Sequence, residues 1–180
     1  MRQIGKQILT LVAWLGLAAA SLAEPLVTTV VTDPLTGVAI DGYDPVSYFI
    51  HPDPTPGKPD FEYVWNGVPW YFESAANRDV FIRSPDIYAP QYGGHCLMSL
   101  SRGFLSDGKP RLYLIEGLKL YFFYSTGNRE AFLLSKSEAL KQAEKNWPTL
   151  SKALAAPDDP GSGLASSSAD AGSASVAAGG

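Results

Sequence analysis

The chain has 180 residues, 46% of them hydrophobic and 18% charged, and its formal net charge is −4 at pH 7. This length is sufficient for one domain with its own hydrophobic core, and the composition is that of a globular protein. The acidic balance, without a run of basic residues, argues against nucleic acid as a partner.

Residues 1–23 have the composition of a secretory signal peptide. Arg2 and Lys6 precede an apolar stretch, residues 8–20, and the sequence Ser-Leu-Ala that ends at Ala23 is of the kind that signal peptidase accepts. We therefore expect cleavage near Ala23–Glu24 and a protein that is periplasmic or secreted. The apolar stretch is too short to span a bilayer comfortably and no second one follows, so we expect no stable membrane insertion after cleavage.

The next segments predict two short strands on either side of a turn. Residues 27–32 (VTTVVT) are rich in β-branched side chains and predict the first strand, and residues 46–49 (VSYF) predict the second. Between them, residues 41–45 (DGYDP) have the aspartates, glycine and proline that are typical of a turn.

A β-hairpin followed by a helix is predicted next. Asn66-Gly67 separates two alternating aromatic runs, residues 61–65 and 68–72, and this dipeptide suits the positive φ angles of a type I′ turn. Ser74 then has the position of an N-cap for a helix over residues 74–83, which the following Ser-Pro dipeptide ends.

The second half is predicted to contain a short helix, a second hairpin and two further helices. Two glycines introduce the short helix at 94–102, and residues 111–125 form the hairpin around Glu116-Gly117. The last helices are predicted at 128–134 and 138–146, and Pro148 limits the second of them. No internal repeat is seen at the spacing of solenoid proteins.

Together these elements predict a small single α+β domain, at about residues 24–156, with aromatic β-hairpins packed on short helices. Residues 157–180 are almost entirely alanine, glycine, serine, aspartate and proline. Such a tail cannot bury enough apolar surface to offset its ordering entropy, so we expect it to be disordered.

Several motifs in this order resemble those of exported bacterial YHS domain proteins. They are AIDGYDPVSYF, the Trp-Asn-Gly hairpin that ends in YFES, then NRDVF, SPDIYAPQYGGHC and finally NWP. The resemblance covers about residues 38–150, which is nearly all of the predicted folded part. It implies a YHS-type domain for residues 24–156.

The resemblance connects the chain with metal-handling proteins, but the cysteines of their metal site are not present in this sequence. YHS domains recur in copper-transporting ATPases, where cysteines in a DPVCGM motif and an FCSxxC motif are thought to bind metal. In this chain the corresponding positions are Ser47, Glu73 and Asn77, none of which is a thiolate ligand. The metal site of the transporter-type members is therefore expected to be absent here.

The exported branch of the family instead carries a GGxC motif, which here comprises Gly93, Gly94, His95 and Cys96. In some relatives the last position is thought to be selenocysteine, which implies a position used for sulfur chemistry. The branch has no settled biochemical activity, so the resemblance alone does not assign one.

Cys96 is the only cysteine of the chain, so an internal disulfide is excluded and the sulfur has another role. The first hypothesis is a soft-metal site, with a copper ion held by Cys96, His95 and Met98. Adjacent helical residues point about 100° apart, so His95 and Cys96 would need further ligands. The candidates from other segments are His51, Asp41 and Asp44, although the two aspartates also suit a turn.

Two other hypotheses stay open. A helix N-terminus after the glycines, with His95 beside it if protonated, would favour the thiolate of Cys96 and hence a periplasmic thiol redox protein that uses an external thiol. Alternatively, Cys96 only fills space and the aromatic surface makes the chain an interaction module for an unknown periplasmic protein. The chain lacks the motifs of phosphate-binding loops, serine hydrolases and zinc proteases, so a binding or accessory role is expected before an enzymatic one.

Overall fold

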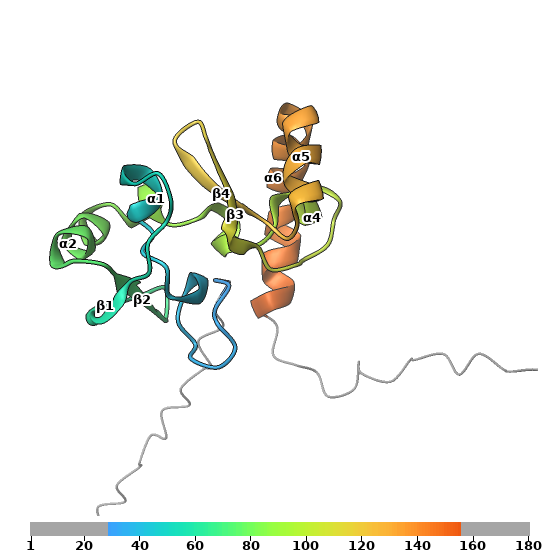
Figure 1. Ribbon diagram of the computed structural model, residues 1–180. Helices are drawn as coiled ribbons and strands as arrows, with labels where there is room; N and C mark the ends of the chain where they lie inside the picture. Colours follow the sequence, from blue (N-terminus) through green and yellow to red (C-terminus); the bar gives the residue numbers. More distant parts are fainter. Residues whose placement is uncertain (1–28, 156–180) are drawn as a thin grey trace, which may run out of the picture.

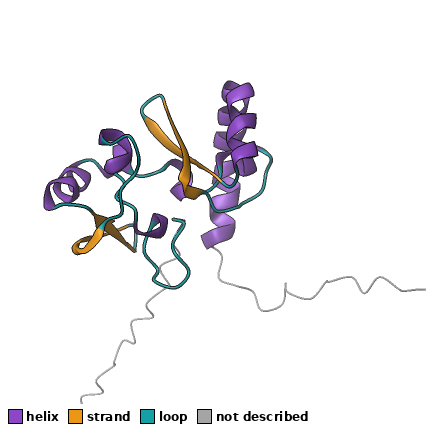
Figure 2. Cartoon of the chain, viewed as in Figure 1, coloured by secondary structure: helices purple, strands orange, loops and turns teal. Residues whose placement is uncertain are grey.

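Two antiparallel hairpins, each followed by a helix, organise residues 29–155, the part of the chain that the computed structural model describes (Figures 1 and 2). The α+β class predicted from the sequence is confirmed. The predicted signal peptide, residues 1–23, and the predicted disordered tail, residues 157–180, lie outside the described residues. Within residues 29–155, no helix combines the length and the apolar character needed to cross a membrane.

The first half of the chain contains the predicted hairpin and its helix. Asn66 and Gly67 have φ angles of 50° and 77°, which confirms the type I′ turn. Ser74 caps the following helix by accepting a hydrogen bond from the backbone N–H of Asn77, as predicted. The elements are η1 (Ile40–Gly42), α1 (Ser47–Ile50), β1 (Lys58–Trp65), β2 (Val68–Phe72), α2 (Ala75–Arg83) and α3 (Pro85–Tyr88).

The second half contains the same kinds of element. Its hairpin turns at Gly117 and Leu118, both with φ near 60°, one residue later than the sequence suggests. Ser125 caps the next helix by accepting from the backbone N–H of Asn128. The elements are η2 (Gln91–Gly94), α4 (Leu97–Ser101), β3 (Lys109–Glu116), β4 (Lys119–Phe123), α5 (Thr126–Leu134) and α6 (Lys136–Ala155).

The two halves are repeats of one structural plan. The bounds of β3, β4 and α5 are those of β1, β2 and α2 moved by a constant 51 residues, and both hairpins have an irregular register at the same place. The sequence analysis missed this repeat because its period exceeds solenoid spacing and few residues are identical. Among the identical pairs are Ser74 and Ser125, Asn77 and Asn128, and Phe81 and Phe132.

The repeat extends upstream through the glycine turns, at a separation of 52 residues. Asp41 and Gly42 have positive φ angles of 53° and 75°, and Gly93 and Gly94 have 63° and 90°. Each turn is hydrogen-bonded to the segment just before its hairpin. The carbonyl of Gly42 accepts from the N–H of Gly57, and the carbonyl of Gly94 accepts from the N–H of Gly108. The loop between these two contacts is one residue shorter in the second repeat.

The β3–β4 hairpin lies between two hydrophobic cores. In Figure 1 it separates the first repeat, with α1, α2, β1 and β2, from the helices α4, α5 and α6. Leu120 and Phe122 pack into the core of the first repeat, whereas Tyr121 and Phe123 pack into the core of the second. Alternation along one strand therefore joins both cores.

Three segments differ from their predicted structure. Residues 29–32 form no strand, and Thr32 makes only an isolated bridge to Ala39. Residues 46–49, predicted as a strand, belong to a helical turn because the Asp44 carboxylate accepts from the N–H of Val46 and so caps the segment. Helix α6 continues through Pro148, since its apolar side stays packed on α4 and α5.

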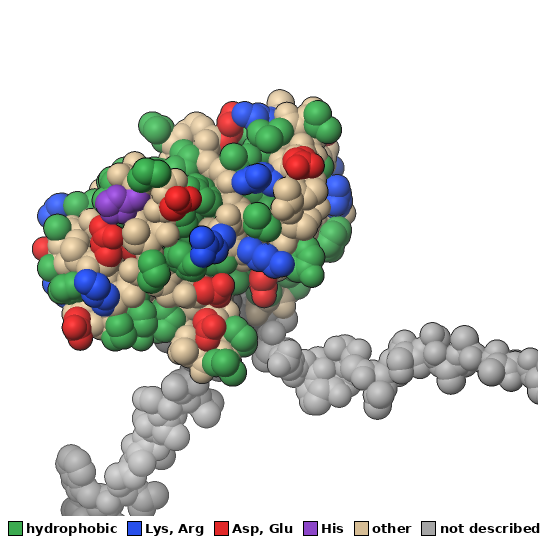
Figure 3. Space-filling model, in the orientation of Figure 1, with side chains coloured by type: hydrophobic (Ala, Val, Ile, Leu, Met, Phe, Trp, Pro, Cys, Tyr) green, Lys and Arg blue, Asp and Glu red, His purple; other side chains and the backbone are tan. Residues whose placement is uncertain are grey.

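Charge is mixed over the surface that Figure 3 shows. Acidic, basic and hydrophobic side chains alternate on this face without a large patch of one charge. This distribution agrees with the absence of a basic run in the sequence.

Gly108 provides a test of the contact between turn and hairpin. A Cβ at this position would lie 2.4 Å from both the Gly94 carbonyl oxygen and the Phe122 Cβ. We expect Gly108→Ala to lower the free energy of unfolding by about 2 kcal/mol or more, because a backbone atom must move. The matched control, Gly127→Ala on α5, adds a methyl with only an ordinary contact and should be neutral or slightly stabilising. Equal urea midpoints for the two variants would contradict the close approach.

Candidate functional site

Cys96 lies at the junction of the glycine turn and the short helix of the second repeat. It is the N-cap residue of α4, is fully buried, and pairs with Phe122 of β4 through an isolated parallel bridge. Its own N–H donates to the carbonyl of Ser106 at 2.8 Å. Backbone contacts on two sides therefore fix the position of the sulfur.

Polar groups surround the Cys96 sulfur. The Asn128 Nδ2 donates to Sγ at 3.4 Å, and the hydroxyl and N–H of Ser99 and the N–H of Tyr124 lie near enough to lower the pKa of the thiol. Burial raises the pKa of Cys96, but these polar groups outweigh it, and the net pKa lies below the ordinary value. The site thus favours the thiolate.

The first repeat holds a carboxylate in the equivalent place. Asp44, at the position of Cys96, is fully buried and accepts from the N–H of Glu73 at 2.9 Å and from Nδ2 of Asn77 at 2.7 Å. Glu73 and Asn77 are the counterparts of Tyr124 and Asn128, whose groups point at the sulfur. We call this arrangement the donor cradle: a backbone N–H after the hairpin and a side-chain amide on the next helix, from Glu73 and Asn77 in one repeat and from Tyr124 and Asn128 in the other. The fold therefore uses it twice, once around a carboxylate and once around a sulfur.

A short chain of polar groups connects this cradle with solvent. The exposed Arg102 donates from Nη1 to Oδ1 of Asn128 at 3.5 Å, while Nδ2 of the same amide donates to Cys96. The arginine contact is long and exposed, and it agrees with an amide whose N–H side faces the sulfur. Asn128 is half-buried and covers Cys96 on this side.

A second hydroxyl supports the Ser99 donor. The Oγ atoms of Ser99 and Ser106 lie 2.6 Å apart, so that Ser106 can donate to Ser99 and leave the Ser99 hydroxyl hydrogen available to the sulfur. Such a chain strengthens each of its hydrogen bonds.

His95 faces away from this cradle. Its ring is buried, lies 5.9 Å from the Trp147 ring, and has Nδ1 3.4 Å from Oδ1 of Asp107 but without a hydrogen-bond partner. Burial lowers the pKa of His95, and the charge of Asp107 offsets this only in part. His95 is therefore neutral at neutral pH and does not supply the positive charge that the thiol hypothesis allowed for.

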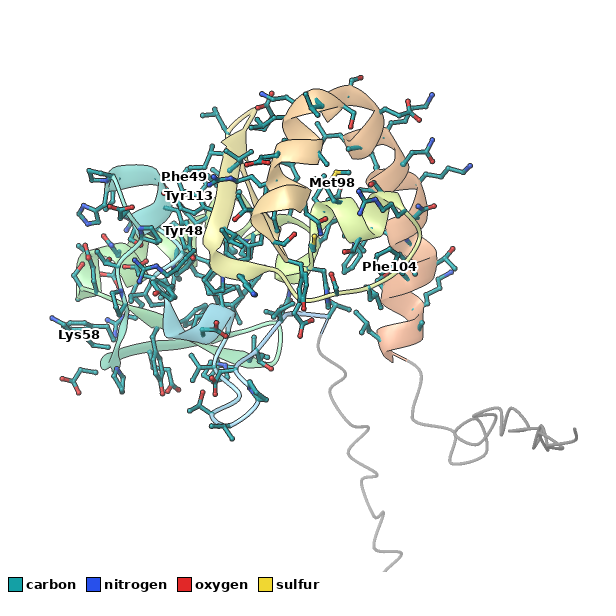
Figure 4. The ribbon with its side chains drawn as sticks, turned by 45° about the vertical axis from the view of Figure 1, so that its right-hand side comes forward. Tyr48, Phe49, Lys58, Met98, Phe104 and Tyr113 are labelled. Atoms are coloured by element: carbon teal, nitrogen blue, oxygen red, sulfur yellow. The ribbon has the colours of Figure 1, made fainter. Side chains whose placement is uncertain are left out.

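Met98 packs in the hydrophobic core of the second repeat. Its exposed fraction is 6%, and in Figure 4 it lies on α4, between α5 and α6. This environment is that of a side chain that fills space between helices.

The other predicted ligands lie in the first repeat. His51 donates from Nε2 to Oε1 of Glu73 at 2.8 Å, and the same carboxylate accepts from Thr55 and Asn77. The hydrogen bond from His51, followed by that from Thr55, lowers the pKa of Glu73. Asp44 caps α1 and belongs to this network through Asn77, as the turn interpretation requires.

Asp41 lies in the turn that precedes this network. Its backbone has a φ of 53°, in the left-handed region, and its side chain is exposed. Burial of part of the carboxyl group, followed by the charges of Asp33 and Asp107, raises its pKa.

The three positions that match the YHS metal cysteines do come together. Ser47 donates to the Asp44 carbonyl at 2.6 Å, and Asn77 donates to the carboxylates of both Asp44 and Glu73. A hydrogen-bonded network thus stands where the resemblance places thiolates. Throughout residues 29–155, no three His, Cys, Asp or Glu side chains are grouped so as to hold one ion.

Sequence reasoning missed the residues that hold the sulfur. Asn128, Ser99 and the N–H of Tyr124 carry no recognised motif, and Asn128 is 32 residues from Cys96. The available pattern was the repeated Ser-x-x-Asn-Arg that begins both α2 and α5. Comparisons with protein-family models, with curated proteins and with solved structures find no match for this chain.

Removal of the Asn128 amide should raise the pKa of Cys96. A hydrogen bond to a charged group contributes about 1.5–3 kcal/mol, so Asn128→Ala should raise the midpoint of thiolate formation by about one pH unit. The ultraviolet absorbance of the thiolate against pH measures this midpoint. The counterpart variant, Asn77→Ala, serves as the control and should leave the midpoint unchanged, and an equal shift in both variants would contradict the cradle.

A lowered pKa of Cys96 also makes stability depend on pH. Between the folded pKa and the ordinary value of about 8.5, the unfolded chain binds more protons than the folded chain. The free energy of unfolding, relative to Cys96→Ser, should therefore rise with pH across this window and level off above it. The advantage should be lost as the pH falls through the folded pKa. Urea unfolding at a series of pH values tests this, and a constant difference would show that the folded pKa is ordinary.

Proposed function

We propose that the protein is an exported thiol redox protein of the YHS type that acts through Cys96. The observation that supports this is the cradle of donors that holds a carboxylate at Asp44 and the sulfur at Cys96. A position built for a negative charge keeps the thiol in its nucleophilic form.

Burial of the sulfur limits the substrate to a small molecule. Cys96 has no exposed surface, and the amide of Asn128 is the movable group between it and Arg102 at the surface. Movement of this side chain would open the sulfur to small molecules, namely a peroxide and a low-molecular-weight thiol, but not to a folded protein disulfide. We therefore propose a small peroxide as the oxidant.

The reaction proceeds in balanced steps. The thiolate attacks one peroxide oxygen, the S–O bond forms as the O–O bond breaks, and the departing hydroxide takes a proton to become water, which leaves a sulfenic acid. An external thiol then forms a mixed disulfide with Cys96 and releases water, because the chain has no second cysteine. A second external thiol releases the reduced Cys96 and the external disulfide.

The copper site predicted at Cys96, His95 and Met98 stays a prediction. A thiolate is also the form of cysteine that binds Cu(I), so the cradle favours one of the three ligands. The contact of His95 with Trp147 and the core packing of Met98 support the thiol hypothesis over the copper hypothesis.

Reaction with hydrogen peroxide tests the proposal. At pH 7 a thiol whose pKa is held below its ordinary value should be oxidised faster than free cysteine, of which only a few per cent is ionised. Quenching with catalase, unfolding and alkylation of the remaining Cys96 thiol, followed by mass spectrometry, measures the rate, and Cys96→Ser should take up no alkylating reagent at this position. A rate no faster than that of free cysteine would refute the redox role.

A Cu(I) titration against a chromogenic chelator distinguishes the metal hypothesis. We expect the wild type and Cys96→Ser to withdraw Cu(I) equally poorly from the chelator. Tight binding that is lost in Cys96→Ser, together with slow oxidation, would favour copper instead.

A further inference from the structure

A groove follows the seam between the two repeats, on the side of the molecule where α3 and α6 approach the turn η2. It consists of two adjoining hollows of about 520 and 430 Å³, which share the side chains of Gln91, Tyr92, Lys119 and Trp147. Cys96 lines neither hollow. A ligand bound in this groove would therefore not contact the Cys96 thiol.

Aromatic side chains line the groove, and each of them packs against further aromatic rings. The rings of Tyr92 and Trp147 lie 5.6 Å apart, and Tyr92 also lies 6.2 Å from Tyr121. At the other end, Trp65 stacks edge-on against Trp70 and Phe81 of the first core. These contacts hold the rings in place before a ligand arrives, and half-buried ring surfaces remain available to it.

Amide, acidic and basic side chains line the same two hollows as these rings. Asn66 and Gln91 contribute amides, Asp86 and Glu144 contribute carboxylates, and Lys119 contributes an ammonium group. A groove with charges of both signs is matched neither to a polyanion nor to a lipid tail. It is matched to a neutral ligand rich in hydroxyl groups, because each of these side chains can donate to or accept from a hydroxyl.

Tyr92 provides a further neutral donor in the groove. Burial, followed by the charges of Tyr121 and Glu144, raises the pKa of Tyr92 to about 12, so its hydroxyl stays protonated at neutral pH. Its backbone is held in the left-handed region, at a φ of 57°, which is unfavourable for a side chain of this size.

Two positions that are buried in the first repeat line the groove in the second. The counterpart of Tyr92 is Ile40, which has a similar φ of 46° but is buried in the first core. The counterpart of Lys119 is Val68, which is also buried. In the second repeat both positions line the groove, so residues that serve packing in one repeat present an aromatic ring and a cation to a ligand in the other.

We propose that this groove binds a neutral oligosaccharide, with the apolar faces of its sugar rings on the aromatic side chains and its hydroxyl groups on the amides and charged groups between them. Sugar rings combine C–H faces with hydroxyl edges, and the groove is lined by both aromatic rings and hydrogen-bonding side chains. Two adjoining hollows suit a chain of rings better than a single sugar.

Titration with three soluble probes tests the proposal: chitohexaose, cellohexaose and maltohexaose. Isothermal calorimetry and tryptophan fluorescence of the purified protein should detect at least one of them, because Trp65 and Trp147 line the groove. Trp147→Ala should weaken this binding about tenfold or more, since stacked aromatic contact is lost. Trp147 is half-buried, so Lys119→Ala and Gln91→Ala provide variants at the rim that should also weaken binding while the urea midpoint is retained.

Two controls make the outcome decisive. Tyr124→Ala removes an exposed aromatic side chain that does not line the groove and should bind like the wild type. Cys96→Ser should also bind normally, so that failure of the redox proposal would leave this one intact. The proposal is overturned if no probe binds at millimolar concentration, or if the groove variants and Tyr124→Ala bind equally well.

Discussion

One hydrogen bond recurs in both halves of this protein and ties each half together. An asparagine in the first turn of the helix after the hairpin donates from its side-chain amide to a buried acceptor before the short helix of the same repeat. The acceptor is an oxygen of Asp44 in the first repeat and the sulfur of Cys96 in the second. Because a buried donor without a partner is costly, each repeat must place a strong acceptor at this point.

The two repeats satisfy this constraint in opposite ways. In the first, the carboxylate of Asp44 is surrounded by donors, and the neighbouring Glu73 is occupied by His51 and Thr55, so the network is closed on itself. In the second, a single sulfur replaces two carboxylate oxygens. A cysteine matches such donors best when it is ionised, so the same constraint gives a closed network in one repeat and a lowered thiol pKa in the other.

The shared hairpin explains how the two repeats become one structure. Phe122 faces the first core and contacts Tyr48, while Tyr121 and Phe123 face the second core. The same strand pairs with Cys96 through the isolated bridge at Phe122 and contributes Lys119 to the groove. The cradle and the groove are thus both positioned by β4, although Cys96 lines neither hollow of the groove.

The sequence by itself determined the local elements of this protein. The Asn66-Gly67 turn, the Ser74 cap and the alternation of Trp70 and Phe72 were all readable, because such preferences act over a few residues. Only the tertiary structure decided what Cys96 touches, since Asn128 reaches the sulfur across 32 residues of chain and the energy of that contact depends on burial. Tertiary packing likewise carried α6 through Pro148 and turned residues 46–49 into a helix, because apolar contact and capping by Asp44 outweigh local propensity.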